Sequence, residues 1–161
     1  MRSWRQAMQD LLTVMAIWLS VNFGLPAIDE KPRIEFVSAA RMAEVRRERL
    51  AAERSHGVVE IGQGTSPDTG HEFHAIYDDV SRTIYLPSDW TPASSAHVSM
   101  LLHEMVHHLQ NAGALKYECS EARERPAYQA QARWLELFGK KLEEEFKIDP
   151  MTILVRTSCM Y

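Results

Sequence analysis

Two histidines and a glutamate, in the order His103-Glu104-x-x-His107, have the types and spacing that favour a specific chemistry. Residues four positions apart on an α-helix lie about 40° apart around its axis and one turn along it, so both imidazoles can bind one metal ion. The carboxylate of Glu104 follows the first imidazole and can accept a proton from a metal-bound water. The pattern therefore predicts a metal centre with hydrolytic chemistry.

A third protein ligand is expected, because catalytic zinc sites usually combine three protein ligands with one water molecule. The residue six positions after His107 is Gly113, and no histidine follows His108. A carboxylate from a later helix is then the natural third ligand. The glutamates close enough in sequence to consider are Glu118, Glu121, Glu124 and Glu136.

Three segments resemble small, largely uncharacterised bacterial zincin-like metallopeptidases of the gluzincin type. The segments are Ile-Tyr-Leu-Pro at 84–87, His-Glu-x-x-His-His-x-Gln at 103–110, and Arg-Glu-x-x-Ala-Tyr-x-x-Gln at 123–131. The resemblance covers roughly residues 73–138. It implies one zinc ion per chain held by His103, His107 and Glu124, with Glu104 as the general base in peptide-bond hydrolysis.

Two residues depart from the pattern of these peptidases. Tyr128 stands where such peptidases often carry an aspartate, so the groups that support the ligands must differ. Pro126 follows Glu124 by two positions, and proline is tolerated mainly in the first turn of a helix. We therefore expect Glu124 at the very start of the second helix, and Glu121 is the alternative third ligand.

The resemblance also implies the fold class and the mode of substrate binding. The expected fold is α+β, with a small, partly antiparallel sheet packed on the metal-binding helix and a second ligand-bearing helix. The strand at 82–86 is expected at the sheet edge, where its free backbone groups would pair with an extended peptide. Two other interpretations stay open: a non-catalytic, zinc-stabilised binding or regulatory domain, and a zinc hydrolase that acts on a non-peptide amide.

Several other polar residues are weaker candidates for a role in the site. His108 is expected to be a surface residue or a support for a ligand, because it lies about 140° around the helix from His103. The residues that can hydrogen-bond ligands or line a cleft are Gln110, Tyr128 and Gln131. The candidates for stabilising an oxyanion are Tyr85, Tyr117 and Tyr128. The histidines expected to be ordinary surface or strand residues are His71, His74 and His97.

The elements that must position these side chains follow from apolar periodicity and turn residues. The metal-binding helix is expected at about 96–111, with its N-cap at Ser94 or Ser95 and a stop at Gly113. The second helix is expected at 121–142. The other expected elements are a strand at 33–38, an exposed helix at 39–54, a loop at 57–70 with a possible strand at 58–61, a hairpin of 73–77 with 83–86, and a final strand or tail at 151–155.

Two features leave the compartment of the protein open. Residues 1–27 are predicted to form an amphipathic helix of the mature protein, with a signal peptide as the alternative. A mature helix would fit the cytoplasm, and a signal peptide would fit a periplasmic or secreted protein. Cys119 and Cys159 can form a disulfide in an oxidising compartment and would be free thiols in the cytosol.

Composition limits the remaining classes of function. The chain has 161 residues and a formal net charge of −4, which fits one globular domain and argues against a basic face that binds nucleic acid. No apolar run reaches the roughly 18–20 residues needed to span a bilayer. Two cysteines exclude a disulfide-rich scaffold and a cysteine-only zinc site. The sequence gives no indication of the oligomeric state.

Overall fold

The computed structural model describes residues 1–55 and 75–160. The described part of the chain is mixed α+β, with six helices and a three-stranded sheet. The elements in chain order are α1 (Trp4–Phe23), β1 (Arg33–Val37), α2 (Ala39–Ser55), β2 (Ile76–Asp78), β3 (Thr83–Pro87), α3 (Ser95–Ala112), α4 (Ser120–Glu136), α5 (Leu142–Phe146) and α6 (Pro150–Thr157). The predicted loop at 57–70, the possible strand at 58–61, His71 and His74 lie outside the described residues.

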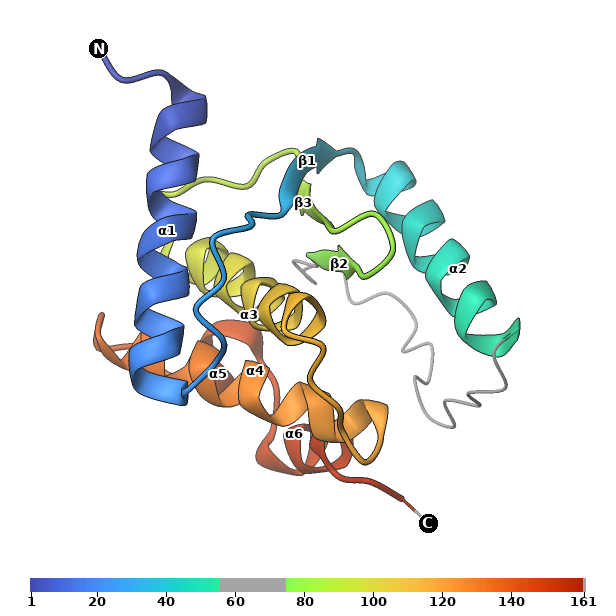
Figure 1. The fold of residues 1–161 in the computed structure, drawn as a ribbon. Helices are drawn as coiled ribbons and strands as arrows, with labels where there is room; N and C mark the ends of the chain where they lie inside the picture. The colour runs from blue at the N-terminus through green and yellow to red at the C-terminus, as the bar shows by residue number, and fades with distance from the viewer. Residues whose placement is uncertain (56–74, 161) are drawn as a thin grey trace.

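The sheet lies between α2 and α3 (Figure 1). Side chains alternate across β3: Ile84 and Leu86 join the main core with α3, whereas Tyr85 packs on the other face against Met42 and Val45 of α2. This alternation is the period-two pattern of a strand that is covered on both faces. The predicted strand at 33–38, helix at 39–54 and antiparallel hairpin are confirmed by β1, α2 and the pairing of β2 with β3.

The prediction that the strand at 82–86 lies at the sheet edge is wrong. The strand order is β1-β3-β2, so β3 is central, with β1 parallel on one side and β2 antiparallel on the other. Pro87, which has no N–H to donate, is the last residue of β3 and lies opposite Val37. The N–H of Ser88 makes the next bond, to the carbonyl oxygen of Val37 at 2.9 Å. A peptide substrate therefore cannot pair with β3 as predicted.

The central helix α3 is buried on most of its faces. It packs against α1, α4, β2 and β3. The hydroxyl of Ser94 caps its start by accepting a hydrogen bond from the N–H of His97 at 3.2 Å, and Gly113 follows its end, as predicted. The apolar side chains of α3 in the core are Val98, Met100, Leu101, Leu102, Met105, Val106 and Leu109. Because α3 is fixed on several sides, its polar side chains have fixed directions.

The N-terminal helix α1 is part of this core. It lies along one side of α3 (Figure 1) and buries a stripe at helical spacing, formed by Met8, Leu12, Met15 and Leu19. The amphipathic helix predicted for residues 1–27 is therefore present. None of the helices in the described ranges is long and apolar enough to cross a membrane.

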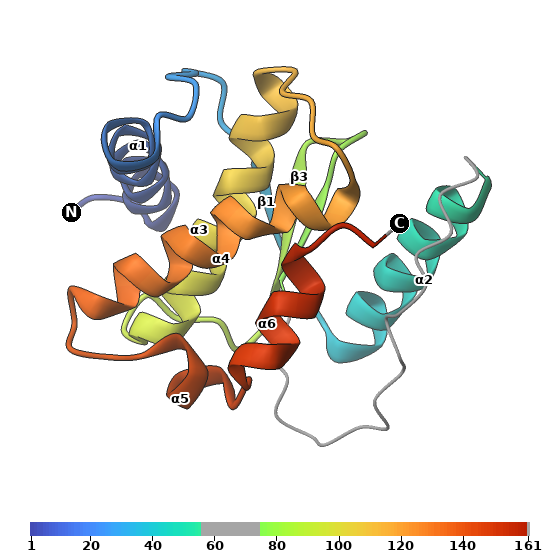
Figure 2. The ribbon, with the colours of Figure 1, turned by 90° about the horizontal axis from the view of Figure 1, so that it is seen from below.

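The C-terminal third differs from the sequence prediction in two ways. Helix α4 ends at Glu136 rather than at 142, because Gly139 takes a positive φ of 70° and turns the chain into α5. The predicted final strand or tail at 151–155 lies in a helix, α6, with Asp149 as its N-cap and Pro150 in its first turn. Figure 2 shows that α4 crosses α3 and that α6 lies beside α4.

A disulfide joins the start of α4 to the end of α6. It links Cys119 and Cys159 across 40 residues of sequence, with their Cα atoms 5.8 Å apart. Of the two states that the sequence left open, the structure has the paired one.

Candidate metal centre

Three side chains from two helices converge at the crossing of α3 and α4. The Nε2 atoms of His103 and His107 lie 3.0 and 3.2 Å from Oε2 of Glu124, and Nε2 of His107 lies 3.1 Å from its Oε1. One potential ligand atom from each residue lies within 4.8 Å of those of the other two. The structure thus brings the predicted ligand triad together and forms a possible metal-binding site.

The third member is Glu124 rather than Glu121. Helix α4 begins at Ser120, so Glu124 lies in its second turn and not at its very start as predicted. Pro126 is accommodated inside the helix. Glu121 lies in the first turn and accepts a hydrogen bond from the hydroxyl of Ser120 at 3.2 Å.

The ring orientation of His107 is set by a chain of side chains behind it. Its Nδ1 lies 2.9 Å from Oε1 of Gln110. That oxygen also accepts a hydrogen bond from Nε of Arg123 at 3.1 Å, and the Gln110 amide nitrogen donates to the Arg123 carbonyl oxygen at 2.9 Å. Because a guanidinium only donates, the amide of Gln110 has one allowed orientation, and Nδ1 of His107 must carry the proton.

The ring of His103 is held in the same way, by Gln131 of α4 and, behind it, Ser99 of α3. Its Nδ1 lies 2.9 Å from Oε1 of Gln131, whose amide nitrogen donates to the hydroxyl oxygen of Ser99 at 3.3 Å. The Ser99 hydroxyl itself donates to the carbonyl oxygen of Ala96 at 2.7 Å, so it accepts from Gln131. Nδ1 of His103 is therefore also a donor, and its Nε2 faces Glu124.

These bonds decide what the triad can hold. With both Nδ1 atoms protonated, two neutral imidazoles and one carboxylate direct only acceptor atoms at one another. Such a cluster needs a positive charge at its centre, either a metal ion or an added proton on one ring. The donor set of two imidazoles and a carboxylate therefore fits a divalent cation.

The pKa values of the triad reflect the same need for positive charge. Burial lowers the pKa of His103, but the hydrogen bond and the charge of Glu124 raise it more, so the net shift is upward. Burial raises the pKa of Glu124, and His107 and His103 lower it well below its ordinary range. Glu124 is therefore a carboxylate at neutral pH.

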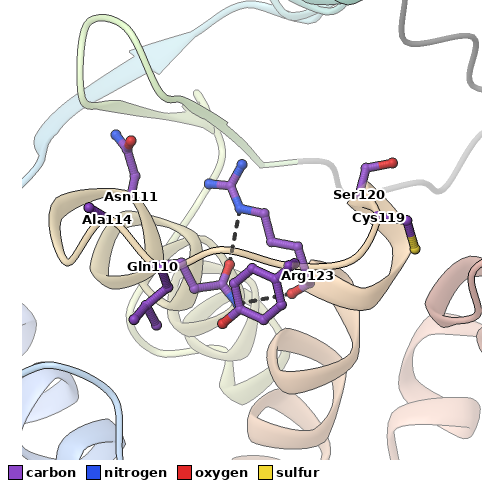
Figure 3. Close-up of a pocket in the computed structure, with 8 residues that line it drawn as sticks. Gln110, Asn111, Ala114, Cys119, Ser120 and Arg123 are labelled. Atoms are coloured by element: carbon purple, nitrogen blue, oxygen red, sulfur yellow. Dashed lines mark hydrogen bonds between the residues drawn. The ribbon is translucent and has the colours of Figure 1, made fainter.

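An ion pair on the far side of Gln110 extends the network to the hairpin. Arg123 donates from Nη1 and Nη2 to the two carboxylate oxygens of Asp79 at 2.8 and 2.6 Å. Burial raises the pKa of Asp79, but Arg123 lowers it more, so the net shift is downward. Figure 3 shows the two hydrogen bonds between Arg123 and Gln110 in a cavity of about 350 Å³ between the end of α3 and the start of α4.

Glu104, the predicted general base, is 8% exposed. Among the described residues, no side chain or backbone group forms a hydrogen bond with its carboxylate. Glu104 directly follows His103 in sequence, and its charge contributes to the upward shift of the His103 pKa. Burial lowers the pKa of Arg49 on α2, but the charges of Glu104, Glu53 and Glu124 raise it more, so the net shift is upward.

Of the three tyrosine candidates, Tyr128 is the one whose ring contacts a residue of the triad within the described ranges. Its ring meets the ring of His103 edge-on, with centroids 4.8 Å apart and planes at 80°. Burial raises the pKa of Tyr128, so its hydroxyl is protonated at neutral pH. Tyr117 lines the cavity beside Gln110, and Tyr85 packs against the cluster under α2.

His108 was expected at the surface or as a support for a ligand, and His97 at the surface or in a strand, but both are buried residues of α3. His108 is fully buried: its Nδ1 lies 3.1 Å from the hydroxyl of Tyr77 and its Nε2 lies 2.7 Å from the carbonyl oxygen of Glu30. His97 is 8% exposed, and its Nδ1 accepts the N–H of Thr91 at 3.0 Å. Both predictions are wrong, because each ring finds its partners in segments distant along the chain or in the preceding turn. Neither ring takes part in the triad.

Three members of the supporting network were not predicted as functional residues. Arg123 carries a weak signal, since it precedes Glu124 in the segment used for the resemblance. Asp79 lies in the turn between β2 and β3, and its distance of 44 residues from Arg123 leaves no local signal. Ser99 shares a face of α3 with His103 at a spacing of four residues, which is the one pattern that could have indicated it.

A comparison with models of known protein families identifies the family of this chain. The chain belongs to the DUF6647 family. The family is described as a domain of unknown function, and its sequence model matches residues 5–161. No curated protein and no solved structure matches the chain. The family match thus covers nearly the whole chain, but the description of the family assigns no activity to the triad.

Proposed function

We propose that this protein is a zinc-dependent metallopeptidase with a zincin-like arrangement of its two site helices. One observation carries the proposal: His103, His107 and Glu124 converge as acceptors, and Glu104 lies beside them. The peptide bond is proposed as the substrate because the segments at 103–110 and 123–131 resemble those of gluzincin-type peptidases.

Distances within the triad support zinc as the metal. Zinc bound tetrahedrally at about 2.0–2.1 Å has ligand atoms about 3.3 Å apart along each edge of the tetrahedron. The contacts of the two Nε2 atoms with Glu124 are 3.0–3.2 Å, and the ligand atoms of all three residues lie within 4.8 Å of one another, which is compatible with one zinc ion between them. When bound, zinc lowers the pKa of a coordinated water to about 7 and polarises a carbonyl group.

The residues of the chain have separate roles in this proposal. Glu104 accepts a proton from the attacking water through its carboxylate and later returns a proton to the leaving amine. Gln110 and Gln131 hold the two imidazoles with Nε2 directed at the centre. Side-chain exposures of 12% for His103 and 5% for His107 limit the access of bulk water to the ligands.

The test combines metal content with activity. Purified protein should contain about one zinc per chain by elemental analysis, and the His103→Ala variant should lose it. Glu104→Gln should keep the zinc and lose hydrolysis of a peptide library. Protein that binds no metal even after zinc is added at neutral pH would refute the proposal. Zinc binding with the same hydrolysis in wild type and Glu104→Gln would remove Glu104 as the base, and zinc binding without any hydrolysis would favour a non-catalytic domain.

A further inference from the structure

We propose that Tyr128 donates a hydrogen bond to the substrate oxygen that gains negative charge during hydrolysis, and that Arg156 on the disulfide-anchored helix α6 positions Tyr128. The inference rests on the proposed function and assigns a catalytic residue and a positioning residue to it. Tyr128, Tyr85 and Tyr117 were equivalent candidates in the sequence, and the contacts around the triad distinguish them.

Tyr128 lies on the same face of α4 as the ligand Glu124. The two residues are four positions apart, which is about one helical turn. The Tyr128 ring meets the His103 ring edge-on at 4.8 Å between centroids. This ring contact places Tyr128 beside one of the proposed metal ligands.

The hydrogen bonds of Tyr128 leave its own proton available. Nη1 of Arg156 donates to the Tyr128 hydroxyl oxygen at 3.2 Å. A phenol has one proton and accepts through its oxygen, so the proton of Tyr128 can be donated to another oxygen. Donation from a guanidinium also polarises the phenol and strengthens it as a donor.

The other donors around the triad are already committed within the described ranges. The Gln131 amide donates to Ser99, and the Gln110 amide donates to the carbonyl oxygen of Arg123. The guanidinium of Arg123 is bound to Asp79 through two nitrogens. Tyr128 is therefore the side chain beside the ligands that can serve as an oxyanion donor without breaking a bond that holds the site.

Few apolar contacts hold α6, the helix that carries Arg156. Of its residues only Thr157 is buried, and the exposed apolar ones are Met151, Leu154 and Val155. Its end is fixed by polar and covalent links: Nη2 of Arg125 donates to the carbonyl oxygen of Thr157 at 3.1 Å, and Cys159 is bonded to Cys119. Arg156 lies three residues before Cys159 in sequence, so we expect the disulfide to keep Arg156 against Tyr128.

A phosphinic peptide is the probe, because its tetrahedral phosphinyl oxygens resemble the charged intermediate of peptide hydrolysis. Its dissociation constant is measured by calorimetry on zinc-loaded protein, beside the zinc affinity of each variant. Tyr128→Phe keeps the ring against His103 and should weaken the probe about 10- to 100-fold with unchanged zinc affinity, because one hydrogen bond to a charged oxygen is lost. The matched control is Tyr117→Phe, which should change neither constant.

Three further variants test the positioning role. Arg156→Ala should weaken the probe by a smaller factor, about 3- to 10-fold, and Arg156→Lys should restore part of the loss because lysine still donates. Replacing both Cys119 and Cys159 by serine should give the same loss as Arg156→Ala and add nothing to Tyr128→Phe. Serine at position 119 keeps a side-chain acceptor for the N-cap of α4. The substitution also removes the disulfide without a thiol reductant, which would itself bind zinc.

The results distinguish failure of this inference from failure of the proposed function. Equal probe affinity in wild type and Tyr128→Phe would overturn the role of Tyr128 and leave the metallopeptidase proposal standing. A Tyr128→Phe effect without an Arg156→Ala effect would overturn the positioning role. A zinc-loaded wild-type protein that does not bind the phosphinic peptide at all would refute both this inference and the proposed function.

Discussion

Replacing Gln110 by leucine should weaken zinc binding without unfolding the protein. Gln110 is 1% exposed, and its Oε1 fixes the proton of His107 on Nδ1. Leucine has a similar size but no acceptor, so the His107 ring loses the bond that directs Nε2 toward the metal. The ring can then turn, or change its tautomer, and either change opposes the binding of zinc.

The magnitude follows from which bonds differ between the metal-free and zinc-bound states. Gln110 makes two further hydrogen bonds with Arg123, but these are present in both states and cancel in the binding constant. The bond to His107 remains, and removing such a partner typically costs 10- to 100-fold in metal affinity, or about 1.4–2.7 kcal/mol. We expect a loss at the lower end of this range, about tenfold, because the second imidazole and Glu124 keep their own positions.

Competition between the protein and a chromophoric chelator at neutral pH measures this loss. Gln131→Leu should give a similar loss, because Gln131 holds His103 in the same way. Gln129→Leu is the matched control, since Gln129 lies on the same helix as Gln131 and is exposed. If Gln110→Leu and Gln129→Leu bind zinc with equal affinity, and far-ultraviolet circular dichroism shows both folded, the argument from hydrogen-bond orientation is refuted.

Three further outcomes follow from the contacts described above. Glu124→Ala should lose the bound zinc and Glu121→Ala should keep it, by elemental analysis; the reverse result would reassign the third ligand. The pKa of Asp79 is lowered in the folded protein, so its contribution to stability is present above its ordinary value of 3.8 and is lost as the pH falls through the folded pKa. Asp79→Asn should therefore reduce the loss of unfolding free energy on the acid side of the pH profile. The reduction should be about 1 kcal/mol or less, because the Asp79 carboxylate is 45% exposed. An unchanged slope on the acid side would contradict this. Removing the disulfide between Cys119 and Cys159, which closes a loop of 40 residues, should lower stability in urea unfolding by up to about 4 kcal/mol, and an unchanged midpoint would show that the bond does not restrict the unfolded chain.

The histidine ligands could be predicted from the sequence because their chemistry is local. His103 and His107 share a helical face by spacing alone, whereas Glu124 was one of four nearby glutamates and was selected by the resemblance of the segment 123–131. Local patterns also predicted the Ser94 cap and the hairpin formed by β2 and β3, where neighbouring residues determine the structure. Predictions of this kind need no knowledge of distant contacts.

The errors concern residues whose partners are distant in sequence. The central position of β3 depends on its pairing with β1, which lies 50 residues earlier in the chain, at Arg33 opposite Thr83. His108 is buried because it meets the carbonyl oxygen of Glu30, 78 residues away. The periodicity of residues within α3 or β3 carries no information about such a distant partner. Local patterns therefore predicted the helices and strands but not which segments pack against them.

The polar residues of α3 supply an argument for function that does not depend on any resemblance. Burying a polar group is costly unless it is hydrogen-bonded, and a carboxylate is among the costliest groups to bury. His107, His108 and Gln110 meet this requirement with the partners described above. Glu104 is the exception on this helix, since it is 8% exposed and none of the residues that the structure describes forms a hydrogen bond with its carboxylate. Its place directly after His103, beside the candidate triad, suits the proton transfer to and from a substrate that the proposed function assigns to it.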